Sequence, residues 1–274
     1  MTRENNKKSG FTLIELSIVL VIIGLVVGGV LVGQDLIKSA QTRAQVSQFE
    51  KLNTAATTFR LKYNALPGDI QPADAASLGF FSMATNAAYA ELGHGNIIDD
   101  IGNGTIGEQE RHYYQGETAM FFRHLSEAEL IEGSYGQSLD SLTANISTAT
   151  APASDGLPEA KIGDGNFISM LLDNGVSYYA VSQILSVRIG GGYHYRTTIA
   201  RGMNAADAYN IDLKIDDGVA TTGSVKPRYF DDDDDGMFVD IASYSDTPDC
   251  LDATESYNLT NTNRGCPLSV KVGF

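Results

Sequence analysis

Apolar residues are concentrated near the start of the chain. Residues 11–33 read FTLIELSIVLVIIGLVVGGVLVG, an apolar run in which Glu15 is the one charged residue. At about 1.5 Å of rise per residue, a helix of this length reaches roughly 34 Å, enough to cross the core of a bilayer. The preceding residues 1–10 are polar and carry Arg3, Lys7 and Lys8, which predicts a cytoplasmic N-terminus. The pattern therefore predicts a single-pass membrane protein whose remaining chain lies outside the membrane.

After this run, the pattern changes to that of an amphipathic helix that continues to about Tyr63. Apolar residues recur there at spacings of three and four, which predicts a stripe packed against a globular domain. The stripe consists of Phe49, Leu52, Ala56, Phe59 and Tyr63. The polar positions expected to face elsewhere are Gln45, Gln48, Lys51, Thr54 and Lys62. Pro67 and Gly68 are typical of a helix end.

The rest of the chain predicts shorter elements joined by extended loops. A second amphipathic helix is expected over 117–132, with His124 on its apolar face as a core histidine. Candidate strands cover 167–172, 176–181, 184–189 and 193–200, and a short helix is expected over 205–215. Asp173-Asn174-Gly175 predicts a hairpin turn. Residues 65–115 and 134–165 are expected to be loops.

The net charge and the positions of the histidines argue against two functional classes, nucleic-acid-binding proteins and enzymes. The net charge is −15, and the C-terminal body has no cluster of Lys and Arg, which argues against a nucleic-acid-binding surface there. The four histidines are scattered, and neither an HExxH nor a GxSxG motif is present. We therefore predict that the chain is not an enzyme.

Two cysteines, Cys250 and Cys266, lie near the C-terminus. Their spacing suggests one disulfide and hence an oxidising compartment. The alternative is a pair of free buried thiols.

The junction between the polar start and the apolar run carries the most specific pattern. A secretory signal has a shorter apolar core followed by a small-residue cleavage site, and no such site follows here. A lone carboxylate in a membrane segment costs about 2.5–3.5 kcal/mol on insertion scales, so Glu15 needs a reason. One ordinary reason is that the side chain snorkels to the interface near the end of the helix.

The segment from Lys7 to Leu16 resembles the cleavage and methylation motif of type IV pilins and type II secretion pseudopilins. The resemblance implies that a prepilin peptidase cleaves between Gly10 and Phe11 and methylates the new amine of Phe11. Glu15 falls at the fifth mature position, where the family keeps a glutamate. In a filament, Glu15 is then expected to pair with the amine of a neighbouring subunit. The family commonly has a proline near the middle of this helix, whereas this chain has none before Pro67.

The same resemblance implies an α+β, pilin-like fold. A long N-terminal transmembrane and amphipathic helix would pack on an antiparallel β-sheet domain with extended loops. The expected organisation is a leader peptide at 1–10, a membrane and assembly helix at 11–33, its amphipathic continuation at 34–64, and a periplasmic or extracellular domain at 65–274.

The function implied is that of a structural subunit, a pilin or minor pilin of a type IV pilus-like filament. The expected location is the bacterial inner membrane and then the filament. The expected partners are other pilins, the prepilin peptidase, the inner-membrane assembly platform and membrane lipid. Two alternatives stay open: a pseudopilin of a type II secretion system, and a membrane-anchored periplasmic binding protein. The second is disfavoured, because a plain anchor needs neither the Gly10-Phe11 pair nor Glu15.

Two acidic loops are candidate calcium sites, because calcium prefers six to eight oxygen ligands and a glycine permits the sharp turn between them. The candidate ligands in the first loop are Asp231, Asp233, Asp235 and Asp240. Those in the second are Asp99, Asn103 and Glu110. The resemblance adds general support, since major pseudopilins hold a structural calcium in their C-terminal part. The alternative for each loop is a solvated acidic surface.

Overall fold

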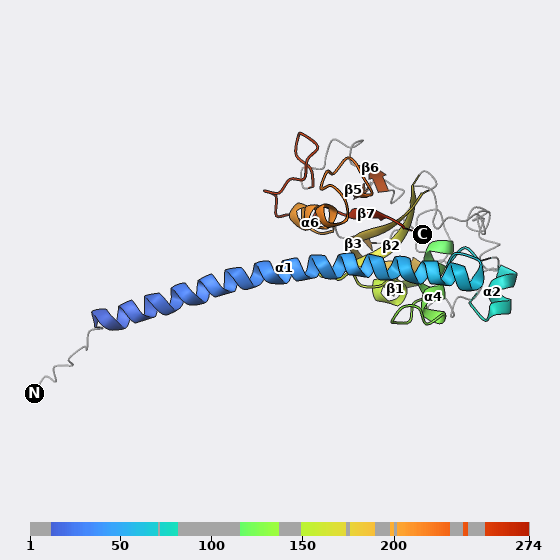
Figure 1. Cartoon of the computed structure of the whole chain (residues 1–274), viewed down its shortest axis with the longest axis horizontal. Helices are drawn as coiled ribbons and strands as arrows, with labels where there is room; N and C mark the ends of the chain where they lie inside the picture. The colour runs from blue at the N-terminus through green and yellow to red at the C-terminus, as the bar shows by residue number, and fades with distance from the viewer. Residues whose placement is uncertain are drawn as a thin grey trace, which may run out of the picture. The chain divides into compact units, whose positions relative to one another are not determined.

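The computed structural model describes residues 12–70, 72–81, 116–136, 149–173, 176–189, 198–199, 202–230, 238–240 and 250–273. The chain divides into two compact units, Met1–Gln41 and Thr42–Phe274. Helix α1, Leu13–Tyr63, belongs to both, because it runs through the boundary between them (Figure 1). The predicted end of this helix at Tyr63 is confirmed.

In the first unit, the described part is the N-terminal portion of α1. Its large apolar side chains are exposed, from Leu13 at 87% to Ile37 at 60%. The most apolar 18-residue window of the helix has a mean hydropathy of 2.9, and none of that window is buried. By length and composition, this helix can therefore cross a membrane.

The second unit is built on an antiparallel sheet with a four-stranded centre, in the order β2–β3–β7–β5. These strands are β2 (Asn166–Asp173), β3 (Val176–Ile189), β7 (Leu268–Lys271) and β5 (Val225–Phe230). The shorter strands β1 (Ala149–Pro152) and β4 (Thr198–Ile199) pair with the second half of β3. Strand β6 (Phe238–Asp240) pairs with β5. A long apolar helix and this sheet together confirm the α+β, pilin-like architecture.

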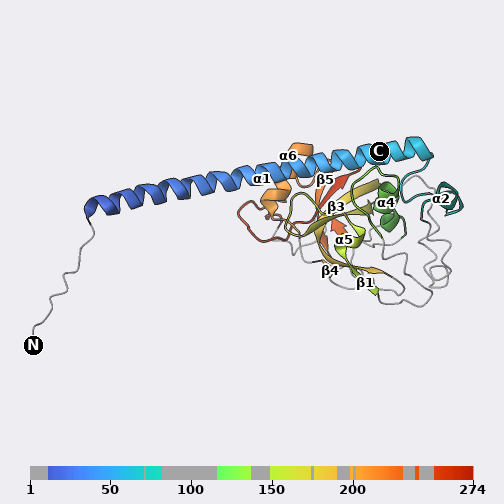
Figure 2. The same ribbon diagram turned by 90° about the horizontal axis from the view of Figure 1, so that it is seen from below.

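The core of the second unit lies between the sheet and two helices, the C-terminal part of α1 and α4 (Gly116–Glu127) (Figure 2). The ring of Phe49 on α1 stacks on Tyr179 of β3 at 5.8 Å between centroids. Phe121 of α4 meets the same tyrosine edge-on at 6.2 Å. Tyr179 is thus the point of the sheet that both helices share, and its hydroxyl reaches Asn53 of α1 at 3.1 Å.

The described residues also form the helices α2 (Pro72–Leu78), α5 (Ala153–Gly156) and α6 (Ala205–Ile215). The prediction of α6 is confirmed. Its start is stabilised by Asn204, whose side chain accepts a hydrogen bond from the Asp207 N–H at 2.8 Å. Helix α4 is shorter than predicted and ends at Glu127. Glu129 adopts a left-handed backbone conformation, and the Leu130 N–H bonds back to the Leu125 carbonyl at 2.9 Å, which closes the helix.

One prediction about α1 is wrong. Gln45 was expected to face away from the domain, yet its side chain is fully buried. The reason is a hydrogen bond of 3.1 Å, in which Gln45 Oε1 accepts from the Ile162 N–H. Gln48 was also expected to face away, yet it makes two bonds to the same loop: its side-chain amide donates to the Glu159 carbonyl at 2.9 Å and accepts from the Lys161 N–H at 3.0 Å. These glutamines attach α1 to the loop that precedes β2.

Candidate functional site

Helix α1 opens with a reciprocal pair of side chains, Thr12 and Glu15. The Thr12 hydroxyl accepts a hydrogen bond from the Glu15 N–H at 3.3 Å. In return, Glu15 Oε2 accepts from the Thr12 N–H at 2.8 Å and from the Thr12 hydroxyl at 2.7 Å. This is the capping-box arrangement, which gives hydrogen-bond partners to backbone N–H groups that have none within the first helical turn.

The capping box changes how the charge of Glu15 is understood. The carboxylate lies in the first turn, where the positive end of the helix dipole stabilises an anion, and it already has local donors. Both bonds use Oε2, and among the described residues Oε1 makes no hydrogen bond. The second oxygen is therefore left to accept a hydrogen bond from another group. Thr12-Leu13-Ile14-Glu15 carries the sequence signal of this box, a threonine followed three residues later by a glutamate, which was not among the predictions above.

Gly10 and Phe11, the residues of the predicted cleavage site, lie outside the described residues, directly before Thr12. Of the three residues predicted for processing and assembly, Glu15 is therefore the one whose surroundings the structure describes.

Comparison with family models places this segment. Residues 5–31 match the model described as the prokaryotic N-terminal methylation motif. The chain carries a prepilin-type N-terminal motif. The matched residues include Gly10, Phe11 and Glu15 and most of the apolar run, and the motif marks structural pilin-type subunits rather than enzymes. Comparisons with curated proteins and with solved structures find no match.

The predicted disulfide between Cys250 and Cys266 is confirmed. Both cysteines are fully buried. The bridge closes a loop at the end of the chain, and the Cys266 N–H fixes one end of it by donating to the Met203 carbonyl at 3.0 Å. The loop also holds Tyr257, whose ring packs edge-on against Tyr209 of α6 at 5.8 Å. The loop that the bridge closes thus packs on α6 through Tyr257.

Replacing Cys250 and Cys266 together with alanine should lower the free energy of unfolding by about 3 kcal/mol, because the unfolded chain regains the entropy of an open loop. Denaturant unfolding of the oxidised chain and of the double variant measures the difference. A reducing agent should lower the stability of the natural chain and leave the variant unchanged. Free thiols in the exported protein would contradict the bridge.

The candidate calcium ligands fall largely where the structure gives no description. Residues Asp99, Asn103, Glu110, Asp231, Asp233 and Asp235 lie outside the described residues. Asp240 is the last residue of β6, and its side chain is likewise not described.

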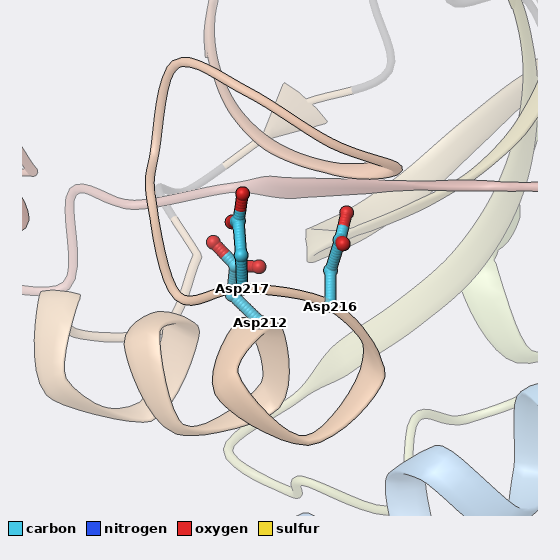
Figure 3. Close-up of side chains that lie close together, drawn as sticks. All are labelled: Asp212, Asp216 and Asp217. Carbon is cyan, nitrogen blue, oxygen red and sulfur yellow. The ribbon is translucent and has the colours of Figure 1, made fainter.

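Within the described residues, a different group of acidic side chains lies close together. It consists of Asp212 on α6, and Asp216 and Asp217 in the turn after it. They project to the same side (Figure 3), and one oxygen of each carboxylate lies within 4.8 Å of the others. Asp212 is buried and accepts hydrogen bonds from the Tyr257 hydroxyl at 2.9 Å and the Gly218 N–H at 3.3 Å. Burial raises the pKa of its carboxyl group.

The two neighbouring aspartates are also bonded within their own turn. Asp217 accepts from the Val219 N–H at 2.8 Å and the Thr222 hydroxyl at 2.7 Å, which lower the pKa of its carboxyl group. Asp216 accepts from the backbone N–H and the hydroxyl of Ser224, the residue before β5. The three carboxylates therefore anchor the connection between α6 and β5. These three residues are not predicted as a group from the sequence, because their grouping depends on the turn that follows α6.

Proposed function

We propose that this chain is a pilin or minor pilin, a structural subunit of a type IV pilus-like filament. The observation that carries the proposal is the prepilin-type motif at residues 5–31, on a helix whose large apolar side chains are exposed from Leu13 to Ile37. A helix of this kind is stable in a bilayer. In water it would be covered by other subunits, because large exposed apolar surfaces mark interaction sites.

In this proposal, prepilin peptidase removes residues 1–10 as a leader and methylates the amine of Phe11. The segment 11–33 holds the subunit in the inner membrane, with 34–64 as its continuation and 65–274 in the periplasm. The assembly platform then transfers the helix from lipid into the filament, where it packs against the helices of other subunits. The amine of one subunit pairs there with Glu15 of its neighbour. The disulfide fits the oxidising compartment that this placement requires.

Processing gives the first test. Mass spectrometry of the membrane fraction should find a mature chain that begins with N-methylated Phe11. Gly10→Val should block cleavage, because a branched side chain stands at the scissile bond, whereas Ser9→Ala should be processed as usual. An intact Met1 in a strain with active peptidase, or a mature end elsewhere, would sink the assignment.

Deletion of the gene distinguishes a pilus subunit from a subunit of the secretion system, since both machines use prepilin-type subunits. Loss of surface filaments by electron microscopy, with normal protein secretion, is the expected result. Retained filaments with loss of secreted proteins would instead assign the chain to a type II secretion pseudopilus.

Calcium binding by the two acidic loops stays a prediction. A ligand that binds only the folded state raises stability, and alternating aspartates before Gly236 offer the oxygen ligands that calcium prefers.

A further inference from the structure

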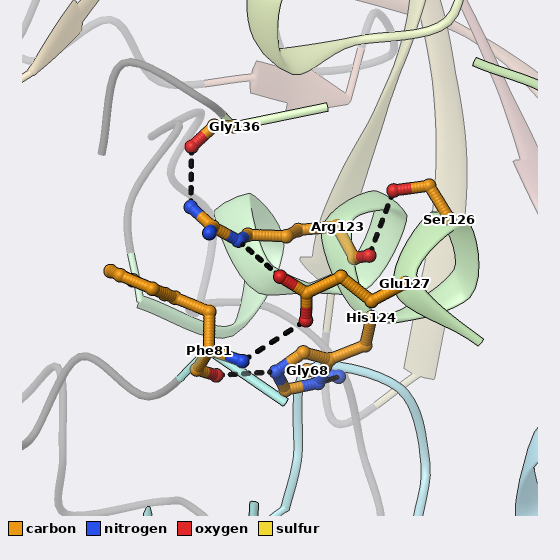
Figure 4. Close-up of polar contacts among 7 residues, drawn as sticks. All are labelled: Gly68, Phe81, Arg123, His124, Ser126, Glu127 and Gly136. Atoms are coloured by element: carbon orange, nitrogen blue, oxygen red, sulfur yellow. Dashed lines mark hydrogen bonds and ion pairs between the residues drawn. The ribbon is translucent and has the colours of Figure 1, made fainter. Parts of the chain in front are cut away.

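A histidine side chain of α4 bonds to the turn that follows α1. His124 Nδ1 accepts a hydrogen bond from the Gly68 N–H at 3.0 Å. On the other side of the ring, Nε2 lies 3.0 Å from the Phe81 carbonyl oxygen (Figure 4). Because a carbonyl can only accept, Nε2 carries the proton, and because a backbone N–H can only donate, Nδ1 carries none. The two backbone groups thus select one neutral tautomer.

The surroundings of the ring also favour the neutral form. His124 is 2% exposed, and its ring stacks on Phe59 of α1 at 6.1 Å between centroids. Phe80 packs against it at 5.5 Å. Removal from water is the largest effect on the ring, and it lowers the pKa of His124 below the ordinary value of 6.5.

Among the residues that the structure describes, few charged or titratable groups surround the imidazole. On α4 these are Glu127, which favours the protonated ring, and Arg123, which opposes it. They form an ion pair with each other at 2.8 Å. The turn contributes Asp69, which is buried and has an interaction partner. From α1 comes Tyr63, whose ring contacts Phe80 rather than the imidazole.

We propose that His124 is an acid-sensitive latch for the turn 64–70, which connects α1 to the rest of the second unit. When Nδ1 takes a proton, it becomes a donor and faces the Gly68 N–H, so the bond that attaches the turn to α4 is lost. Gly68 has φ of 92°, a left-handed conformation that suits glycine, and this conformation belongs to the turn that aims its N–H at the ring.

The latch opens at one end only. The Phe81 side is attached independently of the proton on Nδ1, because Glu127 Oε2 accepts from the Phe81 N–H at 3.0 Å. The Arg123 guanidinium lies 3.7 Å from the centre of the Phe81 ring and donates to the Gly136 carbonyl at 2.6 Å. The protonated ring can still donate from Nε2 to the Phe81 carbonyl. Acid therefore frees the Gly68 end while the Phe81 end stays in place.

The direction of the pH effect follows from the pKa of the ring. The open turn returns His124 to water and so moves its pKa back toward the ordinary value of 6.5, whereas burial in the closed turn lowers that pKa. Above 6.5 both states are neutral and closure does not depend on pH. Below it, the open state binds the proton first, so the ratio of open to closed turn rises about tenfold per pH unit until the lower pKa is reached. This inference concerns the folded subunit and does not depend on the proposed filament.

Amide hydrogen exchange of the full chain in detergent micelles, followed by NMR, tests the latch. Between about pH 7.5 and about pH 5, the protection factor of the Gly68 amide should fall, by up to about tenfold for each pH unit below 6.5. The Phe81 amide, bonded to Glu127, should keep its protection. So should the Ile162 amide, which is bonded to the non-titrating Gln45. An unchanged Gly68 amide, or an equal fall at all three amides, would overturn the proposal.

His124→Gln supplies the matched variant, since glutamine keeps a donor and an acceptor but takes no proton in this range. Protection of Gly68 in this variant should not depend on pH. If the variant does not fold, the three amides of the natural chain and the titration of the His124 ring itself still decide. A ring that titrates at its ordinary pKa of 6.5 in the folded chain would refute the latch.

Discussion

Glu15→Ala should leave the chain inserted in the membrane and lower its incorporation into filaments by at least about 100-fold. In the proposed filament, the carboxylate meets the amine of a neighbouring Phe11 in surroundings of low dielectric constant. Removing one partner of such a pair costs about 3–5 kcal/mol per contact, and each 1.4 kcal/mol is a factor of about ten. The ratio of filament to membrane protein, measured by shearing filaments and blotting both fractions, gives the result.

The capping box supplies the control, because it separates the charge of Glu15 from its role at the start of the helix. Glu15→Gln keeps a side chain that can bond to the Thr12 N–H but removes the charge. Thr12→Val keeps the charge but removes the hydroxyl that bonds to Glu15, a loss of about 1 kcal/mol of helix stability. The pairing mechanism predicts that the glutamine variant assembles as poorly as the alanine variant and that the valine variant assembles nearly normally. The reverse order would show that Glu15 acts as a cap and would refute the pairing.

The elements predicted correctly are those with strong local signals. Helix α1 ends at Tyr63 as expected, since Pro67 and Gly68 follow it and its stripe buries Phe59 completely. The hairpin of β2 and β3 pairs Asp173 with Val176, as the turn sequence between them indicates. Strand β3 is longer than expected, because the two candidate strands 176–181 and 184–189 form one continuous strand.

The missed elements depend on contacts between distant parts of the chain. Strand β7 is four residues long, and its first three residues are buried, so it lacks the alternation that marks a half-exposed strand. It is a strand because β3 and β5 pair with it on its two sides. Gln45 is another case: its position on the helix predicts exposure, whereas its side-chain oxygen bonds to the Ile162 N–H, 117 positions away in the sequence.

The candidate site shows the same division. The prepilin-type motif is contiguous, so the sequence alone was enough to select Gly10, Phe11 and Glu15, and the family model covers all three. The latch at His124 joins residues separated by 56 positions, Gly68 and His124. The sequence therefore predicted a packed core histidine, and only the structure shows that both ring nitrogens are used.

Phe59→Ala should lower the free energy of unfolding of the second unit by about 3–5 kcal/mol, the usual cost of removing a buried phenylalanine. Phe59 is completely buried. Its ring lies 4.6 Å from that of Tyr63, 5.3 Å from that of Phe80 and 6.1 Å from that of His124. The cavity would therefore open between α1, the residues that follow α2, and α4, which meet at this ring. Denaturant unfolding of the full chain in detergent, followed by tyrosine fluorescence, measures the loss.

Leu61→Ala is the matched control, two residues further along the same helix. Successive helical residues turn by about 100°, so Leu61 points away from Phe59, and it is 83% exposed. Alanine is at least as good a helix former as leucine, and an exposed substitution of this kind changes stability by about 0.5 kcal/mol or less. A similar loss in both variants would mean that α1 does not pack on the domain through this face. A loss confined to Phe59→Ala would show that the apolar stripe on the C-terminal part of α1 stabilises the second unit.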